Sequence, residues 1–217
     1  MEMPGGWSMS MTWMRMPGQS WPGAAMAFLG MWAGMMMAMM LPAITPALWR
    51  HRRAMRSLAG QQPGWLTAVV AVAYFVVWTL AGLATFPLGV VLAELAMQYP
   101  ALSRAVPVAA GLTLLLAGAS QFTAWKAGKL RCCRAEPIYT PGARAAWQYG
   151  VRLGLNCVQC CAGLTAILLV LGMMDLRVMA IVAMAITAER VSPAGQRVAR
   201  LIGAIAMLAG LIQLARI

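Results

Sequence analysis

Charged residues are scarce in this 217-residue chain. They make up 10 % of it, whereas about a quarter of a typical soluble domain is charged. Hydrophobic residues make up 62 %, and the mean hydropathy is +0.74. A water-soluble fold of this length cannot bury so much apolar surface. The composition therefore excludes a soluble globular domain and predicts an integral membrane protein.

Histidine and acidic residues are also scarce. The single histidine, His51, lies in a basic run, and this largely excludes a His-rich haem or zinc bundle. Only five acidic residues occur, and no paired carboxylates, Ser–His–Asp arrangement or phosphate-binding glycine loop is present. These absences favour a protein that is neither an enzyme nor an ATP-driven pump. Glu189 is expected to form an ion pair with Arg190 at the membrane interface, with a gate or a proton-linked role as the alternative. The sequence also shows no secretory signal peptide.

Six apolar segments are predicted to be transmembrane helices, because runs of about 17–25 apolar residues are typical of membrane spans. The segments are 24–49, 65–86, 108–125, 150–172, 176–188 and 198–215. The fifth is short, so six spans are expected and five are the alternative. Residues 87–107, which are bounded by prolines, are predicted to form an interfacial helix or a re-entrant segment. The predicted fold is an all-α, polytopic membrane helical bundle.

Basic residues lie mainly on one side of these predicted spans. Thirteen of the 17 lysines and arginines flank the same side, which the positive-inside rule places in the cytoplasm. Both termini are then external, and a methionine-rich tail, 1–23, precedes a membrane domain, 24–217. The net charge of +12 is explained by topology and by attraction to anionic lipid. No nucleic-acid partner is therefore expected.

Five cysteines form two groups. Cys132 and Cys133 lie in LRCCRAEP, a predicted cytoplasmic loop, and Cys157, Cys160 and Cys161 lie in GLNCVQCCAGL, within the fourth span. On a helix the last three share one arc of about 100°. An odd number of cysteines on the reducing side disfavours a disulfide framework. Thiolates bind Cu(I), Zn(II) and iron–sulfur centres, although small residues also serve helix packing.

Methionine is concentrated in GMMMAMMLP, residues 34–42. Met35 and Met39 belong to one helical stripe, and Met36 and Met40 form a second stripe beside it. Thioethers bind Cu(I) reversibly and are candidate relay ligands, although methionine also fills gaps between helices. These methionines and the cysteines of the fourth span lie at comparable depth, so they face each other if the two helices are neighbours. The two prolines that follow are expected to kink the helix.

The methionine run resembles the M-M-x-A-M-M-L-P signature of a bacterial family of predicted metal-binding integral membrane proteins, some described as copper chaperones. The resemblance continues through C-R-x-x-P from Cys133, GLNCVQCCAGL, LVLGMMDLRVMA and E-R-x-x-P from Glu189. It departs at Gln159 and Ala162, where many members carry glycine and tryptophan. By position, it implies a metal-associated signature that consists of Met36, Met39, Met40, Pro42, Cys157, Cys160 and Cys161.

These observations predict a bacterial inner-membrane protein that binds a soft ion, Cu(I) before others, and delivers or moves it. The candidate metal-binding residues are Cys132, Cys133, Cys157, Cys160, Cys161, Met35, Met36, Met39 and Met40. External methionines of the tail would collect the ion. The expected partners are the lipid bilayer and a copper-dependent enzyme or a periplasmic metal-binding protein. Two alternatives stay open: a membrane thiol–disulfide oxidoreductase that uses the C-x-x-C spacing, and a structural subunit whose sulfur residues only pack.

Overall fold

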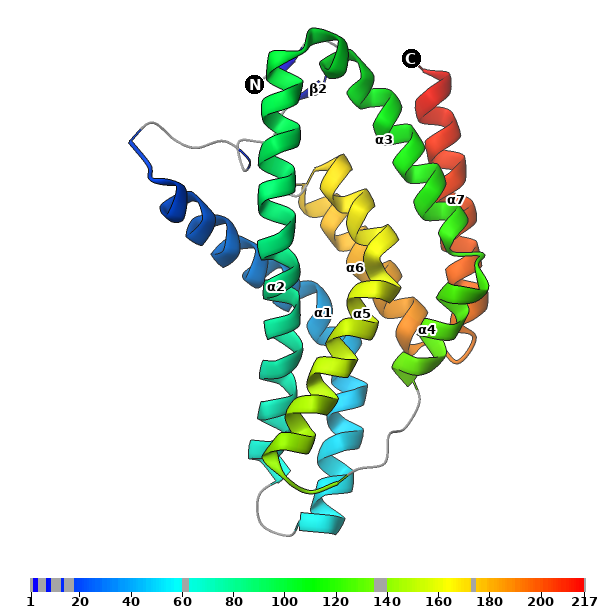
Figure 1. Cartoon of the computed structure of the whole chain (residues 1–217). Helices are drawn as coiled ribbons and strands as arrows, with labels where there is room; N and C mark the ends of the chain where they lie inside the picture. Colours follow the sequence, from blue (N-terminus) through cyan, green and yellow to red (C-terminus); the bar gives the residue numbers. More distant parts are fainter. Residues whose placement is uncertain are drawn as a thin grey trace.

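The computed structural model describes residues 2–3, 7–8, 13, 18–59, 63–134, 140–172 and 175–216. These residues form seven helices and one pair of short strands (Figure 1). The helices are α1 (Trp21–Ala59), α2 (Pro63–Gln98), α3 (Pro100–Ser120), α4 (Ala124–Arg134), α5 (Ala143–Leu171), α6 (Leu176–Val191) and α7 (Gly195–Ala215). Strand β1 (Glu2–Met3) pairs antiparallel with β2 (Trp7–Ser8). The predicted all-α fold is confirmed.

Several of these helices have the length and composition of membrane spans. In the described part of the chain, four helices are long and apolar enough to cross a membrane: α1, α2, α5 and α7. Helices α3 and α4 together make a fifth candidate span, bent by 67° at the break between them. Helix α6 has 16 residues, fewer than a span ordinarily needs. The structure therefore agrees with the lower of the two predicted span counts.

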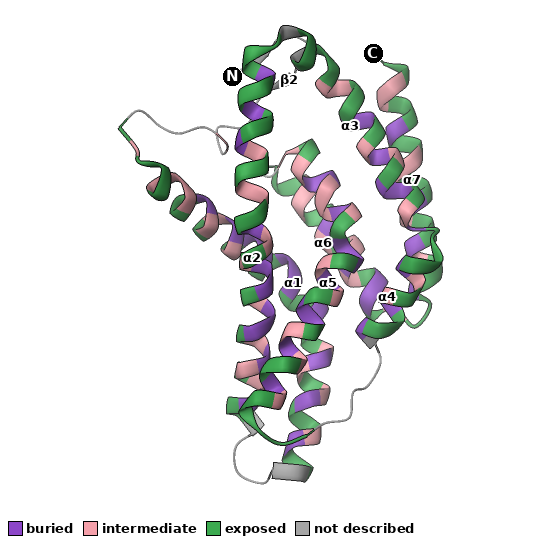
Figure 2. Ribbon diagram, viewed as in Figure 1, coloured by how far each residue is buried: buried purple, intermediate pink, exposed green. Residues whose placement is uncertain are grey.

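The outside of the bundle carries large apolar side chains. On α7, Leu201, Ile205 and Leu208 are each at least 60 % exposed, and their spacing places them on one face of the helix. Figure 2 shows exposed residues along the outward faces of α3 and α7. Such an extended apolar surface suits contact with lipid acyl chains better than contact with water.

Helix α5 lies at the centre of the bundle. It packs against α2, α3, α4 and α6, while α1 packs against α2 and α6 (Figure 1). Helices α3 and α7 pack against each other as a pair. The backbones of these two helices come close. A Cβ added to Gly118 of α3 would lie 2.7 Å from the carbonyl oxygen of Gly203 in α7. Small residues permit this close packing of apolar helices.

Residues 87–107 do not form the separate segment between two spans that the sequence had predicted. Helix α2 continues through Pro87 to Gln98, and α3 begins at Pro100. Only Tyr99 interrupts the helices, with φ −117° and ψ 102°. The physical reason is the following proline, because its ring disfavours helical backbone at the residue before it. A proline inside an apolar helix, by contrast, is often tolerated.

Helix α1 contains both Pro42 and Pro46 without a break in the helix. Figure 1 shows α1 changing direction along its length, between its blue and cyan parts. A proline removes one backbone hydrogen bond and crowds the preceding turn, and both effects bend a helix. The bend turns the second half of α1 so that it runs alongside α2, towards the α1–α2 connection (Figure 1).

Candidate metal centre

Three cysteines lie on the buried face of α5. Cys157, Cys160 and Cys161 are each no more than 2 % exposed, as their predicted shared arc requires. The sulfur atoms of Cys157 and Cys161, one helical turn apart, are separated by 3.8 Å. The described cysteines form no disulfide. The central helix of the bundle therefore presents free thiols to the protein interior.

Two glycines let α2 approach this face closely. A Cβ added to Gly150 would lie 2.5 Å from the Val70 carbonyl oxygen, and one added to Gly154 would lie 2.9 Å from Val77 Cβ. The close approach brings Tyr74 of α2 against the thiols, and its hydroxyl donates a hydrogen bond to Cys157 Sγ at 3.0 Å. Small residues spaced by four thus position the first polar partner of the cysteine row.

Helix α4 supplies a fourth buried thiol. Cys133 is 6 % exposed and Cys132 is exposed, because adjacent residues of a helix point about 100° apart. The sequence had placed both in a loop, and that part of the prediction is wrong, since both lie within α4. The sharp bend after α3 carries α4 across to α5. Of the two cysteines, only Cys133 therefore faces the interior.

The four buried thiols form a continuous row. Cys133 interacts with Cys160, Cys160 interacts with Cys161, and Cys161 is next to Cys157. The row links α4 to the part of α5 that contacts α2. Thiol sulfurs are soft ligands of the kind that soft ions prefer.

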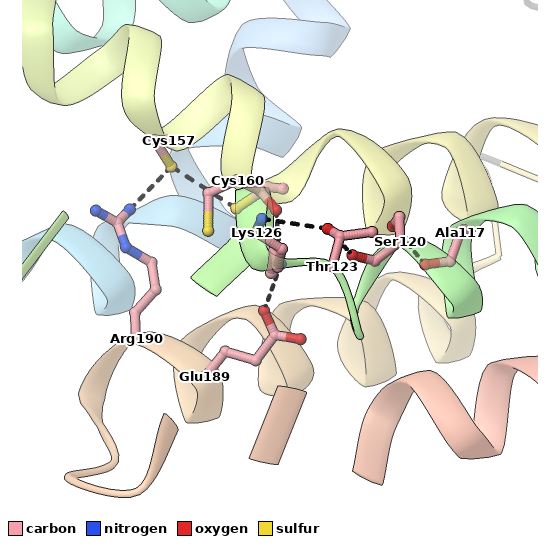
Figure 3. A network of polar contacts seen from close by, with 9 residues as sticks. Ala117, Ser120, Thr123, Lys126, Cys157, Cys160, Glu189 and Arg190 are labelled. Carbon is pink, nitrogen blue, oxygen red and sulfur yellow. Dashed lines mark hydrogen bonds and ion pairs between the residues drawn. The ribbon is translucent and has the colours of Figure 1, made fainter. Parts of the chain in front are cut away.

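Three charged side chains surround the cysteines (Figure 3). Arg190 Nη1 donates to Cys157 Sγ at 2.8 Å. Lys126 Nζ forms an ion pair with Glu189 Oε2 at 2.8 Å and donates to the Cys160 carbonyl oxygen at 2.6 Å. All three charged residues are at most 9 % exposed. Burial of this degree is unusual for charged groups and requires partners such as these.

The sequence had suggested a different pairing, between Glu189 and Arg190 themselves at the membrane interface. The structure contradicts this prediction, because Glu189 pairs with Lys126 of α4 and Arg190 reaches Cys157 of α5. Consecutive residues of a helix point about 100° apart. The end of α6 can therefore contact two different helices with two adjacent side chains.

The four candidate methionines are buried in the same core as the thiols. Met35, Met36, Met39 and Met40 are at most 7 % exposed, and they share one hydrophobic cluster with the four buried cysteines. Met37, which the predicted stripes leave out, is 43 % exposed. Helices α1 and α5 both pack against α2 and α6. The thioethers therefore belong to the core that surrounds the thiols.

Two other features of the sequence are the remaining methionines and the single histidine. The tail methionines 1, 9, 11, 14 and 16 and methionines 173 and 174 lie outside the described residues. His51 is buried, stacks on Tyr149 and has its Nδ1 3.4 Å from Thr67 Oγ1. These contacts suit a packed core residue.

The thiol row suits an ion that needs few ligands. Among the residues that the structure describes, no three His, Cys, Asp or Glu side chains are arranged to hold one metal ion together. Two sulfurs can still share an ion: with bonds of about 2.3 Å and a near-tetrahedral angle they lie about 3.8 Å apart. Cys157 and Cys161 have that separation. The residues therefore fit a soft ion held by two thiolates, and they do not form a closed four-ligand zinc site.

Sequence reasoning missed three polar residues that contact the cysteines. Tyr74 lies within an apolar run, where an aromatic residue gives no specific signal. Lys126 directly follows an apolar segment and was counted among the charges that set topology. Arg190 belongs to the E-R-x-x-P block. Lys126 and Arg190 could have been identified from a general rule. Ionisable residues within membrane segments are energetically costly and mark functional sites.

Fold and site together define a class of protein: a helical bundle with membrane-length helices that encloses a row of free thiols. The family model described as PpoB2, copper chaperone, matches residues 29–213. The chain therefore belongs to this copper chaperone family, which confirms the resemblance stated from the sequence. No curated protein and no solved structure matches the chain.

Proposed function

We propose that this protein binds Cu(I) through its buried thiols and delivers it to a copper-dependent enzyme or exchanges it with a periplasmic metal-binding protein. It would act in a bacterial inner membrane with both termini in the periplasm. Membership of the copper chaperone family supports copper as the cargo. The observation that carries the proposal is the continuous row of four buried thiols from α4 and α5.

Each group of sulfur ligands has its own part in this proposal. Cys157 and Cys161 hold the ion, since their separation of 3.8 Å suits two bonds to one centre. Cys160 and Cys133 offer the next thiols, so that the ion changes ligands without meeting water. The buried thioethers of α1, which bind Cu(I) more weakly than thiolates do, relay it. Cu(I) is a soft ion, and this all-sulfur ligand set matches that property.

A thiol–disulfide oxidoreductase is the rival function. That chemistry requires a thiolate to attack a disulfide sulfur of the substrate, so the attacking sulfur must be accessible. Cys157, Cys160 and Cys161 are each no more than 2 % exposed, which disfavours the rival. Trapping a mixed disulfide at one of them, in protein that contains no metal, would favour it.

Elemental analysis of detergent-purified full-length protein tests the proposal. Cells are supplied with copper, and the protein is purified under reducing conditions. We expect copper in the wild type and its loss in the triple variant Cys157→Ser, Cys160→Ser, Cys161→Ser. Cys132→Ser is the matched control, because this thiol is exposed on the same bundle; it should keep its copper.

Two results would contradict the proposal. One is near-zero copper in the wild type and the triple variant alike, with both proteins showing the same helical circular dichroism spectrum. The other is an equal copper content in the two proteins, which would place the ion elsewhere. Loss of copper from the Cys132→Ser control would likewise show that the buried row is not the main ligand set.

A further inference from the structure

We propose that Arg190 sets the valence of the ion that the thiol row accepts: its fixed buried charge favours a monovalent soft cation over a divalent one. The inference rests on the proposed function, because it concerns the ion held by Cys157 and Cys161. It assigns a specificity-determining role to a residue of α6 that contributes no metal-binding atom.

The buried charges at the site do not cancel. Among the described residues, the buried side chains that carry a full charge at neutral pH are Lys126, Glu189 and Arg190. Lys126 and Glu189 neutralise each other in an ion pair of 2.8 Å. Arg190 instead donates to Cys157 Sγ, also at 2.8 Å. The three residues together therefore leave one positive charge, located against the sulfur of Cys157.

A monovalent and a divalent ion give different net charges when they lie between the same two thiolates. A monovalent ion with two thiolates carries one negative charge, and Arg190 compensates it. A divalent ion with two thiolates is neutral, and the buried guanidinium then has no counter-charge. An uncompensated buried charge is strongly unfavourable. The site should thus prefer Cu(I), or its larger analogue Ag(I), to Zn(II).

The position of Arg190 makes this preference a fixed property of the fold. Arg190 lies in the last turn of α6. The side chain of Asp175 caps the first turn of that helix, because it accepts hydrogen bonds from the backbone N–H groups of Arg177 and Val178. At 9 % exposure the side chain of Arg190 has little access to solvent counter-ions. Arginine also stays protonated under all ordinary conditions. The compensating charge therefore remains when the ion leaves.

The test compares Cu(I) and Zn(II) affinities of detergent-solubilised, full-length protein, with a chromophoric competitor for each ion. Arg190→Gln removes the charge and keeps a hydrogen-bond donor on a shorter side chain. We expect it to lower the ratio of Cu(I) to Zn(II) affinity by on the order of a hundredfold, since a unit charge about 5 Å from the ion has that effect at an effective dielectric constant of about 20. Arg190→Lys should keep most of the wild-type ratio.

Two controls separate charge from structure. Arg190→Lys keeps the buried charge on a side chain of another shape, so its affinity ratio should stay close to that of the wild type. Arg200→Gln removes an exposed arginine and should have no effect. If Arg190→Gln cannot be purified folded, Arg190→Lys still tests the idea, because it must retain the ratio.

The outcomes are distinguishable from failure of the proposed function. If the wild type binds no Cu(I), the proposed function is wrong. If the wild type binds Cu(I) and Arg190→Gln has the wild-type affinity ratio, the role of Arg190 is overturned while copper binding stands. A loss of selectivity in the Arg190→Lys variant would also overturn it, since the buried charge is then not what selects the ion.

Discussion

Replacing Gly150 by alanine should separate the two helices that create the cysteine site. A Cβ at this position would lie 2.5 Å from the Val70 carbonyl oxygen and 2.7 Å from Ala73 Cβ. Ordinary contacts lie at about 3.5 Å, and the first of these atoms belongs to the backbone, which cannot rotate away. Helices α2 and α5 must therefore move apart locally by about 1 Å.

The size of the effect follows from this displacement. Forcing one extra methyl group into a close-packed interface costs about 1–3 kcal/mol. Tyr74 lies one helical turn from Val70, so its hydrogen bond to Cys157, now 3.0 Å, would lengthen towards 4 Å, where such a bond is weak. Losing it adds about 1 kcal/mol. For a chain of this size, the melting temperature should fall by roughly 5 to 10 °C.

Thermal unfolding of the detergent-solubilised protein, followed by circular dichroism, measures the loss of stability. The matched control is Gly34→Ala, because a Cβ on Gly34 of α1 meets no atom within 4 Å; this variant should be at least as stable as the wild type. Gly150→Ala should also bind Cu(I) several-fold more weakly. If Gly150→Ala unfolds at the same temperature as Gly34→Ala, the close α2–α5 contact does not position Tyr74 against Cys157.

Three further predictions concern the polar partners of the thiols. Tyr74→Phe should weaken Cu(I) binding about fivefold, since it removes one hydrogen bond to a ligand sulfur, whereas Tyr99→Phe at an exposed position should not; competition titration measures both. Lys126→Met alone should destabilise the protein by about 3–5 kcal/mol, because Glu189 loses its ion pair. Adding Glu189→Gln should recover part of this loss. If the two substitutions instead show additive losses in thermal unfolding, the pairing of Lys126 with Glu189 is contradicted. Cu(I) affinity should rise with pH by about tenfold per unit for each thiol that must lose a proton; a pH-independent affinity would exclude thiolate ligands.

Sequence patterns predicted the parts of the fold that depend on hydrophobic periodicity. The apolar runs became helices, and the cysteines of α5 lie on one buried face because their spacing follows the helical repeat. The methionines at positions 35, 36, 39 and 40 are buried while Met37 is exposed, as the two predicted stripes require. Local spacing fixes which side chains share a face, so these features needed no knowledge of the neighbouring helices.

The features that sequence patterns could not predict depend on where a helix turns. Lys126 follows an apolar run directly and resembles a topology-setting charge. It is buried because the 67° bend between α3 and α4 directs α4 back against α5 and α6. The same bend buries Cys133 and leaves Cys132 exposed. No local pattern specifies such a bend, since it depends on the contacts that α4 makes after it.

The bend also explains why the charged residues are needed beside the sulfur row. An 11-residue amphipathic helix such as α4, which carries four basic residues, is too short to be stable alone. The ion pair from Lys126 to Glu189 and the bond from Lys126 to the Cys160 carbonyl join α4 to α6 and α5. Because α4 contributes Cys133, these contacts determine whether the row has three thiols or four. Lys126 and Glu189 thus hold the α4 end of the row in place, while Arg190 interacts with its other end at Cys157.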